Sequence, residues 1–491
     1  MSNLMEEIVT PIDGVAANHV ARAQRLKFGT LAVYGSGMLV QDTLALGLGT
    51  LLLFYLTVVC GLSGSAAGIA LGVALVVDSF VDPLVGSISD NSRMRYGRRH
   101  PFMLAAAIPI AIGFGLLFSI PTALSGIALF AYVLFMLMVV RVGLSFFQVP
   151  YIALGAELSD DYAERSTIVA SRVLFTVVAG MSAAFLAYGV FLKGHDGQLV
   201  RAAYAPYAWT CGLLVLLGAG LSTFGTLGSR HRLHAAPDGP ATRQILAEVI
   251  EVFRNRSFSI LFSACLVLFV GLGFAGSLAL HANTYFWKLQ PQQILFITLL
   301  VSLGYFVGVF IAIWLTGRLE KRWIAMIGIA MIGLAQLVPA ALKVFGVIPS
   351  AGELSTLMLA GVFTGIGASC ALIGFQSMMA DAADEHEMLF EARREGLYFA
   401  GISFSAKASS GIGALLAGSV LDLIQFPRDL AGQAVAHAHI AVGTVLRLGI
   451  LQGPGAAAIT AISVVVLFLY RRGRREHEEV RQVLVERRTT K

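Results

Sequence analysis

The stretch that decides the fold of this chain runs from Gly64 to Asp90, GSAAGIALGVALVVDSFVDPLVGSISD, and is followed by NSRMRYGRR, which ends at Arg99. Its first part is long enough and apolar enough to cross a membrane as a helix. Asp78 and Asp82 lie four residues apart in it and therefore share one helix face. Carboxylates inside a bilayer are costly and usually mark an ion or substrate path. The arginines that follow are typical of a helix that leaves the lipid on the cytoplasmic side.

The composition of the whole chain is that of a protein with many membrane spans. Of the 491 residues, 57% are hydrophobic and only 13% are charged, against about 25% charged in soluble proteins. The net charge of +6 does not indicate nucleic-acid binding, because the basic residues lie in short loops and in the C-terminal tail. The four cysteines all lie in apolar runs without CxxC spacing, so neither disulfides nor a zinc site is predicted.

The apolar runs predict an all-α polytopic membrane protein with two six-helix halves. The halves are expected at 30–227 and 258–470, with an N-terminal segment at 1–29, a central loop at 228–257 and a basic tail at 471–491. Such a plan places a substrate site between the halves. The twelve spans are expected near 30–59, 64–90, 102–120, 124–156, 167–192, 204–227, 258–287, 292–317, 323–343, 353–381, 397–424 and 449–470.

The distribution of Lys and Arg predicts the orientation in the membrane. With both termini on the same side, 27 of the 35 basic residues fall on that side and six on the other. Because cytoplasmic loops carry the excess of positive charge, both termini are expected in the cytoplasm. The first 29 residues do not resemble a cleavable signal peptide. We expect a multi-pass protein of the cell (inner or plasma) membrane that works as a monomer among lipids and binds no nucleic acid.

Five ionisable residues are predicted inside the membrane: Asp42, Asp78, Asp82, Arg141 and Lys407. Three acids against two bases leave one negative charge, which favours a site for one monovalent cation, Na⁺ or H⁺. The alternative is that these charges only pair to hold helices together. Two carboxylates on one helix face repel each other, so a purely structural role explains the aspartate pair in span 2 less well than an ion site does.

Further charged residues gather where spans 2, 4 and 10 end on the basic side. Asp90 is expected to pair locally or to cap a helix. For the ends of spans 4 and 10, two interpretations stay open: a solvated loop, or ion pairs between the halves that close this side. The residues that we expect to act in gating are Asp90, Arg98, Arg99, Asp381, Asp384, Arg393 and Glu395.

Several motifs together resemble the glycoside–pentoside–hexuronide:cation symporters of the major facilitator superfamily. The pattern Asp-x-x-x-Asp-Pro-x-x-Gly at 78–86 is followed by the basic turn at 93–99 and by His-Pro-Phe at 100–102. The stretch VPYIALGAEL at 149–158 and the stretch RREGLY at 393–398 are also similar to this family. The resemblance covers nearly the whole chain and implies the major facilitator fold.

The resemblance also implies roles for individual residues. The cation would bind at Asp78 and Asp82, with a hydroxyl from Ser145 and with Lys407 linking the cation and sugar sites. The expected substrate-binding residues are Asp42, Arg141, Gln148, Arg172 and Lys407.

Two departures from the family pattern concern the substrate. Gln148 stands where the melibiose carrier of this family has an aspartate that binds sugar, and Ile152 stands near the place of a stacking tryptophan. The predicted function is therefore symport of a glycoside or sugar-like solute with Na⁺ or H⁺ by alternating access. The alternative is a proton- or sodium-coupled transporter or exporter of an amphiphile such as a lysolipid or drug.

An enzyme is not predicted. The sequence shows no nucleophile–base pair, no metal-ligand cluster and no phosphate-binding loop. No cofactor other than the coupling ion is expected. A receptor that no longer transports is a further alternative, which the complete set of intramembrane charges disfavours because a receptor needs no coupling ion.

Overall fold

The computed structural model describes residues 28–92, 94, 97–159, 161–194, 196–228, 250–390, 395–431, 440–471 and 473–490. Within these residues it contains twelve helices that are long and apolar enough to cross a membrane. The expected all-α polytopic fold is confirmed. In lipid, a helix satisfies its backbone hydrogen bonds within one segment, which is why long apolar runs adopt this structure.

The N-terminal half contains the first six spans. Its first and fifth spans include short π-helical stretches, in which the helix widens by one residue per turn. In chain order the elements are α2 (Phe28–Gly35), α3 (Met38–Leu46), η1 (Gly47–Leu51), α4 (Leu52–Phe54), η2 (Tyr55–Val59), α5 (Gly64–Asp90), α6 (His100–Leu117), α7 (Gly126–Glu157), α8 (Tyr162–Ala184), η3 (Phe185–Phe191), η4 (Gly197–Leu199) and α9 (Arg201–Thr226).

The C-terminal half repeats this plan, and an additional helix follows it. The elements are α11 (Arg256–His281), η6 (Ala282–Phe286), α12 (Pro291–Thr316), α13 (Lys321–Val344), α14 (Ser350–Phe390), α15 (Glu395–Leu423), α16 (Val442–Ile450), η8 (Leu451–Gly455), α17 (Ala456–Leu467) and α18 (Arg474–Thr490).

Polar side chains at the helix starts explain several boundaries. Ser63 precedes α5 and accepts a hydrogen bond from the backbone N–H of Ala66 at 3.2 Å. Asn255 precedes α11 and accepts a hydrogen bond from the N–H of Ser257 at 2.8 Å. Such caps satisfy N–H groups of the first turn that have no partner within the helix.

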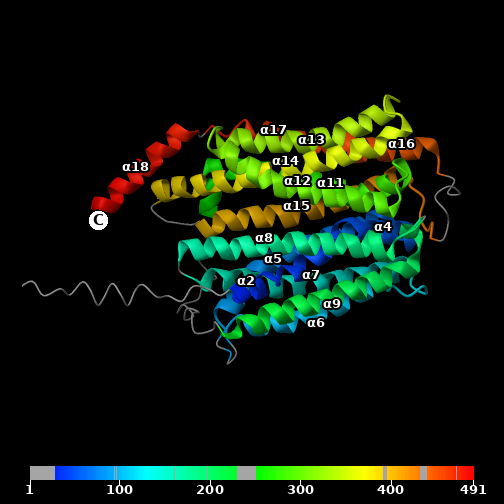
Figure 1. Cartoon of the computed structure of the whole chain (residues 1–491), viewed down its shortest axis with the longest axis horizontal. Coiled ribbons are helices and arrows are strands. Elements are labelled where there is room, and N and C mark those ends of the chain that lie inside the picture. The colour runs from blue at the N-terminus through cyan, green and yellow to red at the C-terminus, as the bar shows by residue number, and fades with distance from the viewer. Residues whose placement is uncertain are drawn as a thin grey trace, which may run out of the picture.

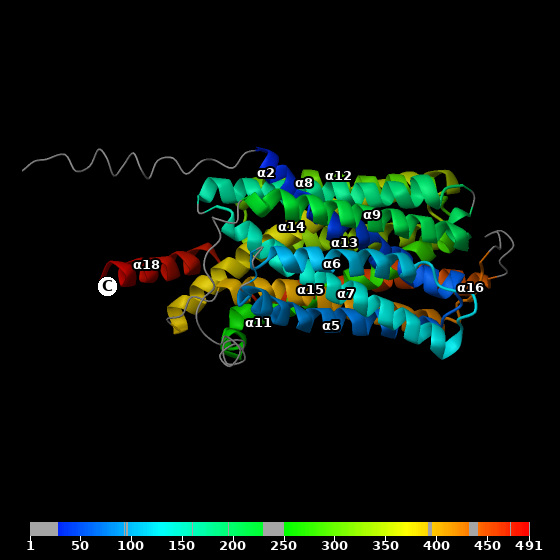
Figure 2. The ribbon, with the colours of Figure 1, turned by 90° about the horizontal axis from the view of Figure 1, so that it is seen from below.

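The spans run between two ends of the molecule, which we call the basic end and the far end (Figure 1). The basic end carries the turns after α5, α7, α12 and α14, as well as α18. The far end carries the turns after η2, α6, η6 and α13. The N-terminal half lies on one side in Figure 1 and the C-terminal half on the other. Figure 2 shows α18 extending away from the bundle at the basic end.

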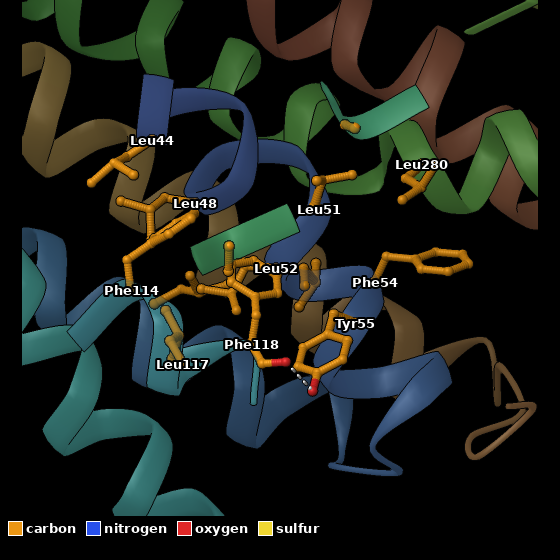
Figure 3. Packing of buried hydrophobic residues seen from close by; sticks show 14 of the residues in the cluster. Leu44, Leu48, Leu51, Leu52, Phe54, Tyr55, Phe114, Leu117, Phe118 and Leu280 are labelled. Atoms are coloured by element: carbon orange, nitrogen blue, oxygen red, sulfur yellow. Dashed lines mark hydrogen bonds between the residues drawn. The ribbon is translucent and has the colours of Figure 1, made fainter. Parts of the chain in front are cut away.

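Among the described residues, the two halves meet in one shared hydrophobic cluster toward the far end. Leu51 and Phe54 of the first span belong to the same buried cluster as Leu280 of α11 (Figure 3). The rings of Phe54 and Tyr285 stack across the halves with centroids 6.3 Å apart. At the basic end, a second cluster, which includes Phe258, lies entirely within the C-terminal half. The halves are therefore packed together at the far end.

Two features at the basic end differ from the sequence-based expectation. The tenth span was expected to end at 381, but α14 continues as a helix to Phe390. The tail was expected only as a basic segment, but α18 is a helix that buries Val480 and Leu484. Hydropathy marks where lipid ends, whereas a helix continues wherever it finds packing partners.

Candidate functional site

The aspartates of α5 and the lysine of α15 form an ionic cluster between the halves. Lys407 Nζ donates hydrogen bonds to Asp82 Oδ2 at 2.7 Å and to Asp78 Oδ1 at 3.3 Å. Ser145 of α7 donates a hydrogen bond to Asp78 Oδ1 at 2.5 Å. The structure therefore brings together all four residues of the predicted cation site. Their role in binding a cation stays a prediction.

The two carboxylates of this cluster differ in burial. The side chain of Asp78 is 2% exposed, while that of Asp82 is 24% exposed and that of Lys407 is 27% exposed. Asp82 and Lys407 thus lie toward open space, and Asp78 lies behind them against Ser145. An ion that enters the cluster would meet Asp82 first.

The oxygen atoms in the cluster suit a hard monovalent cation. Asp82 Oδ1 is buried and has no hydrogen-bond partner among the described residues. Carboxylate and hydroxyl oxygens are the ligands that hard cations prefer in proteins. Asp78, Asp82 and Ser145 supply such oxygens, and the same carboxylates could instead take up a proton.

A second charged group lies on α3 and α8. Asp42 lies close enough to the Thr176 hydroxyl and to the charge of Arg172 to interact electrostatically with both. The guanidinium of Arg172 lies 5.9 Å from the ring centre of Tyr151, which stacks on Tyr34 with centroids 4.7 Å apart. Two of the predicted substrate-binding residues, Asp42 and Arg172, are thus neighbours.

This second group retains polar atoms that are not satisfied. Asp42 Oδ2 and Arg172 Nε are buried without a hydrogen-bond partner in the described part of the chain. Tyr305 of α12, in the other half, is close enough to Asp42 to interact electrostatically with it. The group therefore faces the other half and offers both a donor and an acceptor to a solute between the halves.

The other predicted substrate-binding residues lie on α7. Arg141 is attracted by the charge of Asp78, so it belongs with the cation cluster. Gln148 is buried, and its Oε1 has no hydrogen-bond partner among the described residues. Gln148 follows Ser145 by three residues and therefore shares its helix face. Ile152, one turn further, is 43% exposed.

Arg172 lies within the fifth span, Ser166–Phe191, six residues after its first residue. This base is therefore a neighbour of the predicted intramembrane charges through its attraction to Asp42. The excess of one negative charge among the five residues predicted inside the membrane stays a prediction.

The predicted gating residues of the N-terminal half pair with one another inside that half. Arg99 Nη2 lies 3.0 Å from Asp90 Oδ1. Arg98 and Arg99 both donate hydrogen bonds to the carboxylate of Glu157, at the end of α7. The expectation of a local pair for Asp90 is confirmed. Glu157 thus holds the turn between α5 and α6 to α7.

The predicted gating residues of the C-terminal half also find partners in their own half. Asp381 accepts a hydrogen bond from Lys321 Nζ at 2.6 Å, and His477 of α18 lies 3.3 Å from the same carboxylate. Asp384 lies 4.0 Å from His477. In this structure Asp381 therefore pairs within its own half, and the alternative of an ion pair between the halves that closes this side stays a prediction. Arg393 and the side chain of Glu395 lie outside the described residues.

Polar contacts between the halves occur at the far end. The Thr57 hydroxyl and His281 Nε2 are 2.9 Å apart and link the first and seventh spans. The backbone N–H of Leu430 donates a hydrogen bond to the carbonyl of Val58 at 2.7 Å. These bonds continue the shared core of Figure 3, so the far end is closed.

Comparison with known proteins identifies a family. A family model described as MFS/sugar transport protein matches residues 33–472. An uncharacterized symporter of Synechocystis sp. is 24% identical, with 94% of this chain and 97% of that protein covered. The glucuronide carrier protein homolog of Escherichia coli is 25% identical, with 86% of this chain and 91% of that protein covered.

The comparison with solved structures concerns the fold. The crystal structure of a D-xylose-proton symporter matches with a TM-score of 0.59 and 14% sequence identity. The match covers 90% of this chain and 96% of that one. At this identity the likeness supports the major facilitator fold and says nothing of the solute.

Proposed function

Since the chain belongs to the family of MFS/sugar transport proteins, we propose that it carries a glycoside or similar solute together with Na⁺ or H⁺ by alternating access. The observation that carries this proposal is the contact of Lys407 with both Asp78 and Asp82. The aspartates and the lysine belong to different halves, so an ion that competes for the carboxylates acts on the contact between the halves.

The cation would exchange with the lysine. When Na⁺ binds to Asp78 and Asp82, or when one of them takes up a proton, the negative charge that holds Lys407 is neutralised. Lys407 is then free to meet a solute, while the carboxylates stay satisfied. A ligand shifts a conformational equilibrium only through its different affinity for the two states. The ion supplies that difference because it weakens a bond between the halves.

The structure corresponds to one state of such a cycle. The Lys and Arg distribution predicts that the basic end faces the cytoplasm. The closed far end then faces outward, and the state is inward-facing. In the opposite state, the contacts between Thr57 and His281 would open and the basic ends of the halves would approach each other.

The solute would bind between the Asp42–Arg172 group and the cation cluster. Asp42 Oδ2, Arg172 Nε and Gln148 Oε1 are buried polar atoms without partners among the described residues, and hydroxyl groups of a sugar would satisfy them. The exposed Ile152 offers an apolar contact in place of an aromatic face. This set suits a small polar glycoside with an apolar side.

The test uses purified protein in sealed vesicles with an imposed Na⁺ or proton gradient. Asp82→Asn should abolish uphill uptake of the solute while solute exchange persists, because Asn binds the ion weakly but leaves the solute site intact. Asp429→Asn removes an exposed carboxylate at the far end and serves as the control. Full uphill uptake by Asp82→Asn would contradict the proposal.

A solute screen with the same vesicles separates the remaining alternatives. Glycosides, uronides and lysolipids are compared for ion-dependent binding, and the direction of net transport is followed under each gradient. Ion-dependent binding of glycosides alone supports the proposal. Binding restricted to lysolipids, or net export driven by the ion, would favour the amphiphile transporter instead.

A further inference from the structure

At the far end, a carboxylate of one half binds the first turn of a membrane helix of the other half. Asp422, in the last turn of α15, accepts a hydrogen bond from the backbone N–H of Gly64 at 2.9 Å with its Oδ1. Its Oδ2 accepts one from the N–H of Ser65 at 2.7 Å. Arg428 Nη2 donates a third bond to Oδ1 at 2.7 Å. Both oxygens of Asp422 are thus used, and two of the three bonds cross between the halves.

The N–H groups that Asp422 binds have no acceptor within their own helix. Gly64 and Ser65 open α5, and the first four N–H groups of a helix are not used by the helix itself. They also lie at the positive end of the helix dipole, where a negative charge is stabilised. Hydrogen bonds to an ionised acceptor are roughly twice as strong as neutral ones. Asp422 therefore makes two charge-assisted hydrogen bonds to the other half with a single side chain.

The position of Asp422 is unfavourable within its own helix. It lies at the C-terminal end of α15 (Glu395–Leu423), where the helix dipole disfavours a negative charge. The docking of α5, together with Arg428, offsets this repulsion. A residue whose charge is disfavoured by its own helix, and which takes two of its three bonds from the other half, is suited to control whether the halves meet.

Glycines allow the two helices to approach closely at this point. A Cβ atom on Gly418 would lie 2.1 Å from the carbonyl oxygen of Gly64, and one on Gly64 would lie 2.3 Å from the carbonyl oxygen of Gly418. The backbones of α5 and α15 are thus in direct contact next to Asp422. Any opening of the far end must separate this contact and break the bonds to Asp422.

We infer that Asp422 is a latch that holds the far end closed and sets the equilibrium between the two states of the transport cycle. This inference rests on the proposed alternating access. The same two helices carry the cation cluster, since Lys407 lies about four turns before Asp422 on α15. The helix pair therefore has two ionic contacts between the halves. The contact at Lys407 responds to the cation. The latch does not respond to it, and it sets the free energy that opening of the far end requires after the cation has bound.

The test measures the distance between the halves at the far end. Spin labels are attached to Thr122→Cys and Phe345→Cys, two exposed positions in far-end turns of different halves. The four native cysteines are replaced by alanine, and distances are measured by pulsed electron paramagnetic resonance without added solute. Asp422→Asn should raise the ratio of far-open to far-closed molecules about tenfold, which corresponds to about 1.4 kcal/mol.

A matched control separates the latch from a general effect of charge. Asp429→Asn removes the same charge a few residues away, and the described contacts give the Asp429 carboxylate no bond to α5. Asn also tolerates the positive φ of 55° at this position. This variant should keep the distance distribution of the parent. An equal shift in both variants would overturn the latch, because it would show that only the net charge matters.

A second variant tests the same contact without changing any charge. Gly418→Ala places a methyl group against the backbone of Gly64, so it should also raise the far-open population, by at least as much as Asp422→Asn. This arm remains informative if Asp422→Asn fails to fold. Unchanged distances in Gly418→Ala and Asp422→Asn overturn the inference. Because distances are read without transport, a failure of ion coupling in the parent is a separate result that concerns only the proposed function.

Discussion

The two ends of the molecule use polar interactions differently. At the far end, bonds such as that between Thr57 and His281 cross from one half to the other. At the basic end, Arg99 with Asp90 and Lys321 with Asp381 each stay within one half. At the two ends, the contacts that cross between the halves are thus hydrogen bonds, including those from Asp422 to the first turn of α5, whereas these ion pairs each stay within one half. The difference indicates that the halves are joined at the far end, whereas at the basic end each half is bound only to itself by the ion pairs named above.

The largest effect is expected at Lys407, which lies between the two ends. Lys407→Met leaves Asp78 and Asp82 without the base that neutralises them. Without Lys407 the ion binds without releasing a base toward the solute, so the coupling between the two sites is lost. Because such a coupling is typically worth up to about 3 kcal/mol, ion-driven uptake in vesicles should fall by up to about 100-fold.

A matched lysine checks that result. Lys343 forms an ion pair of 2.5 Å with Glu353, and both residues belong to the C-terminal half. Lys343→Met makes the same chemical change in an ion pair that does not cross between the halves, and it should leave most of the uptake. If the two variants lose uptake to the same extent, the special position of Lys407 is refuted.

The next largest effect is expected at Glu157. Glu157→Gln removes the carboxylate that holds both Arg98 and Arg99, and these side chains are nearly buried. A loss of about 2 kcal/mol should lower the melting temperature by about 2 °C, as seen by thermal unfolding in detergent. Asp381→Asn is the counterpart in the other half. It should lower the free energy of unfolding by less, because Lys321 is 37% exposed. The reverse order would contradict the view that burial decides how firmly each half is held.

A smaller effect is expected at Ser145. Ser145→Ala removes the hydroxyl that donates to Asp78 but leaves both carboxylates in place. A hydrogen bond to a charged group contributes about 1.5 kcal/mol, so the ion concentration for half-maximal uptake should rise about tenfold. Ser79→Ala is the control, since Ser79 Oγ donates to the carbonyl of Leu75 in its own helix. Equal ion dependence in Ser145→Ala and in the parent would place the ion elsewhere.

The smallest effect is expected at His477, which joins α18 to α14. Its side chain is 21% exposed, and Asp381 keeps its bond to Lys321 when His477 is changed. His477→Asn should alter stability by about 0.5 kcal/mol or less and leave uptake unchanged. A large loss of uptake would mean that α18 takes part in the cycle rather than resting on one half.

The spans could be predicted from the sequence because lipid leaves few alternatives to an apolar helix. The end of α14 could not be predicted in the same way. Beyond the lipid, Asp381 keeps the helix in place through Lys321 and His477, and such partners are remote in the sequence. For α18, two buried residues, Val480 and Leu484, give no apolar run that hydropathy detects.

The site was predictable where a charge stands out in an apolar run. Asp78, Asp82 and Lys407 have this signal, and the structure brings them together. Tyr151 and Thr176 have no such signal, because aromatic and hydroxyl side chains are common in membrane helices that only pack. The bond between Asp422 and Gly64 joins residues 358 positions apart, so it depends on how two halves meet, which no local pattern encodes.

The anchoring of α18 has a practical consequence for optical measurements. Its side chain Arg487 donates a hydrogen bond to the carbonyl of Met388 at 3.0 Å, and His477 binds Asp381, so the helix is attached to α14 at two points. A dye on the exposed Glu478 would therefore move together with the C-terminal half. A second dye on the exposed Asn91, at the basic end of the other half, would complete an energy-transfer pair. The distance between these two dyes would then report the movement of one half against the other in single-molecule fluorescence. Both labels lie at the basic end, away from the residues proposed to bind ion and solute.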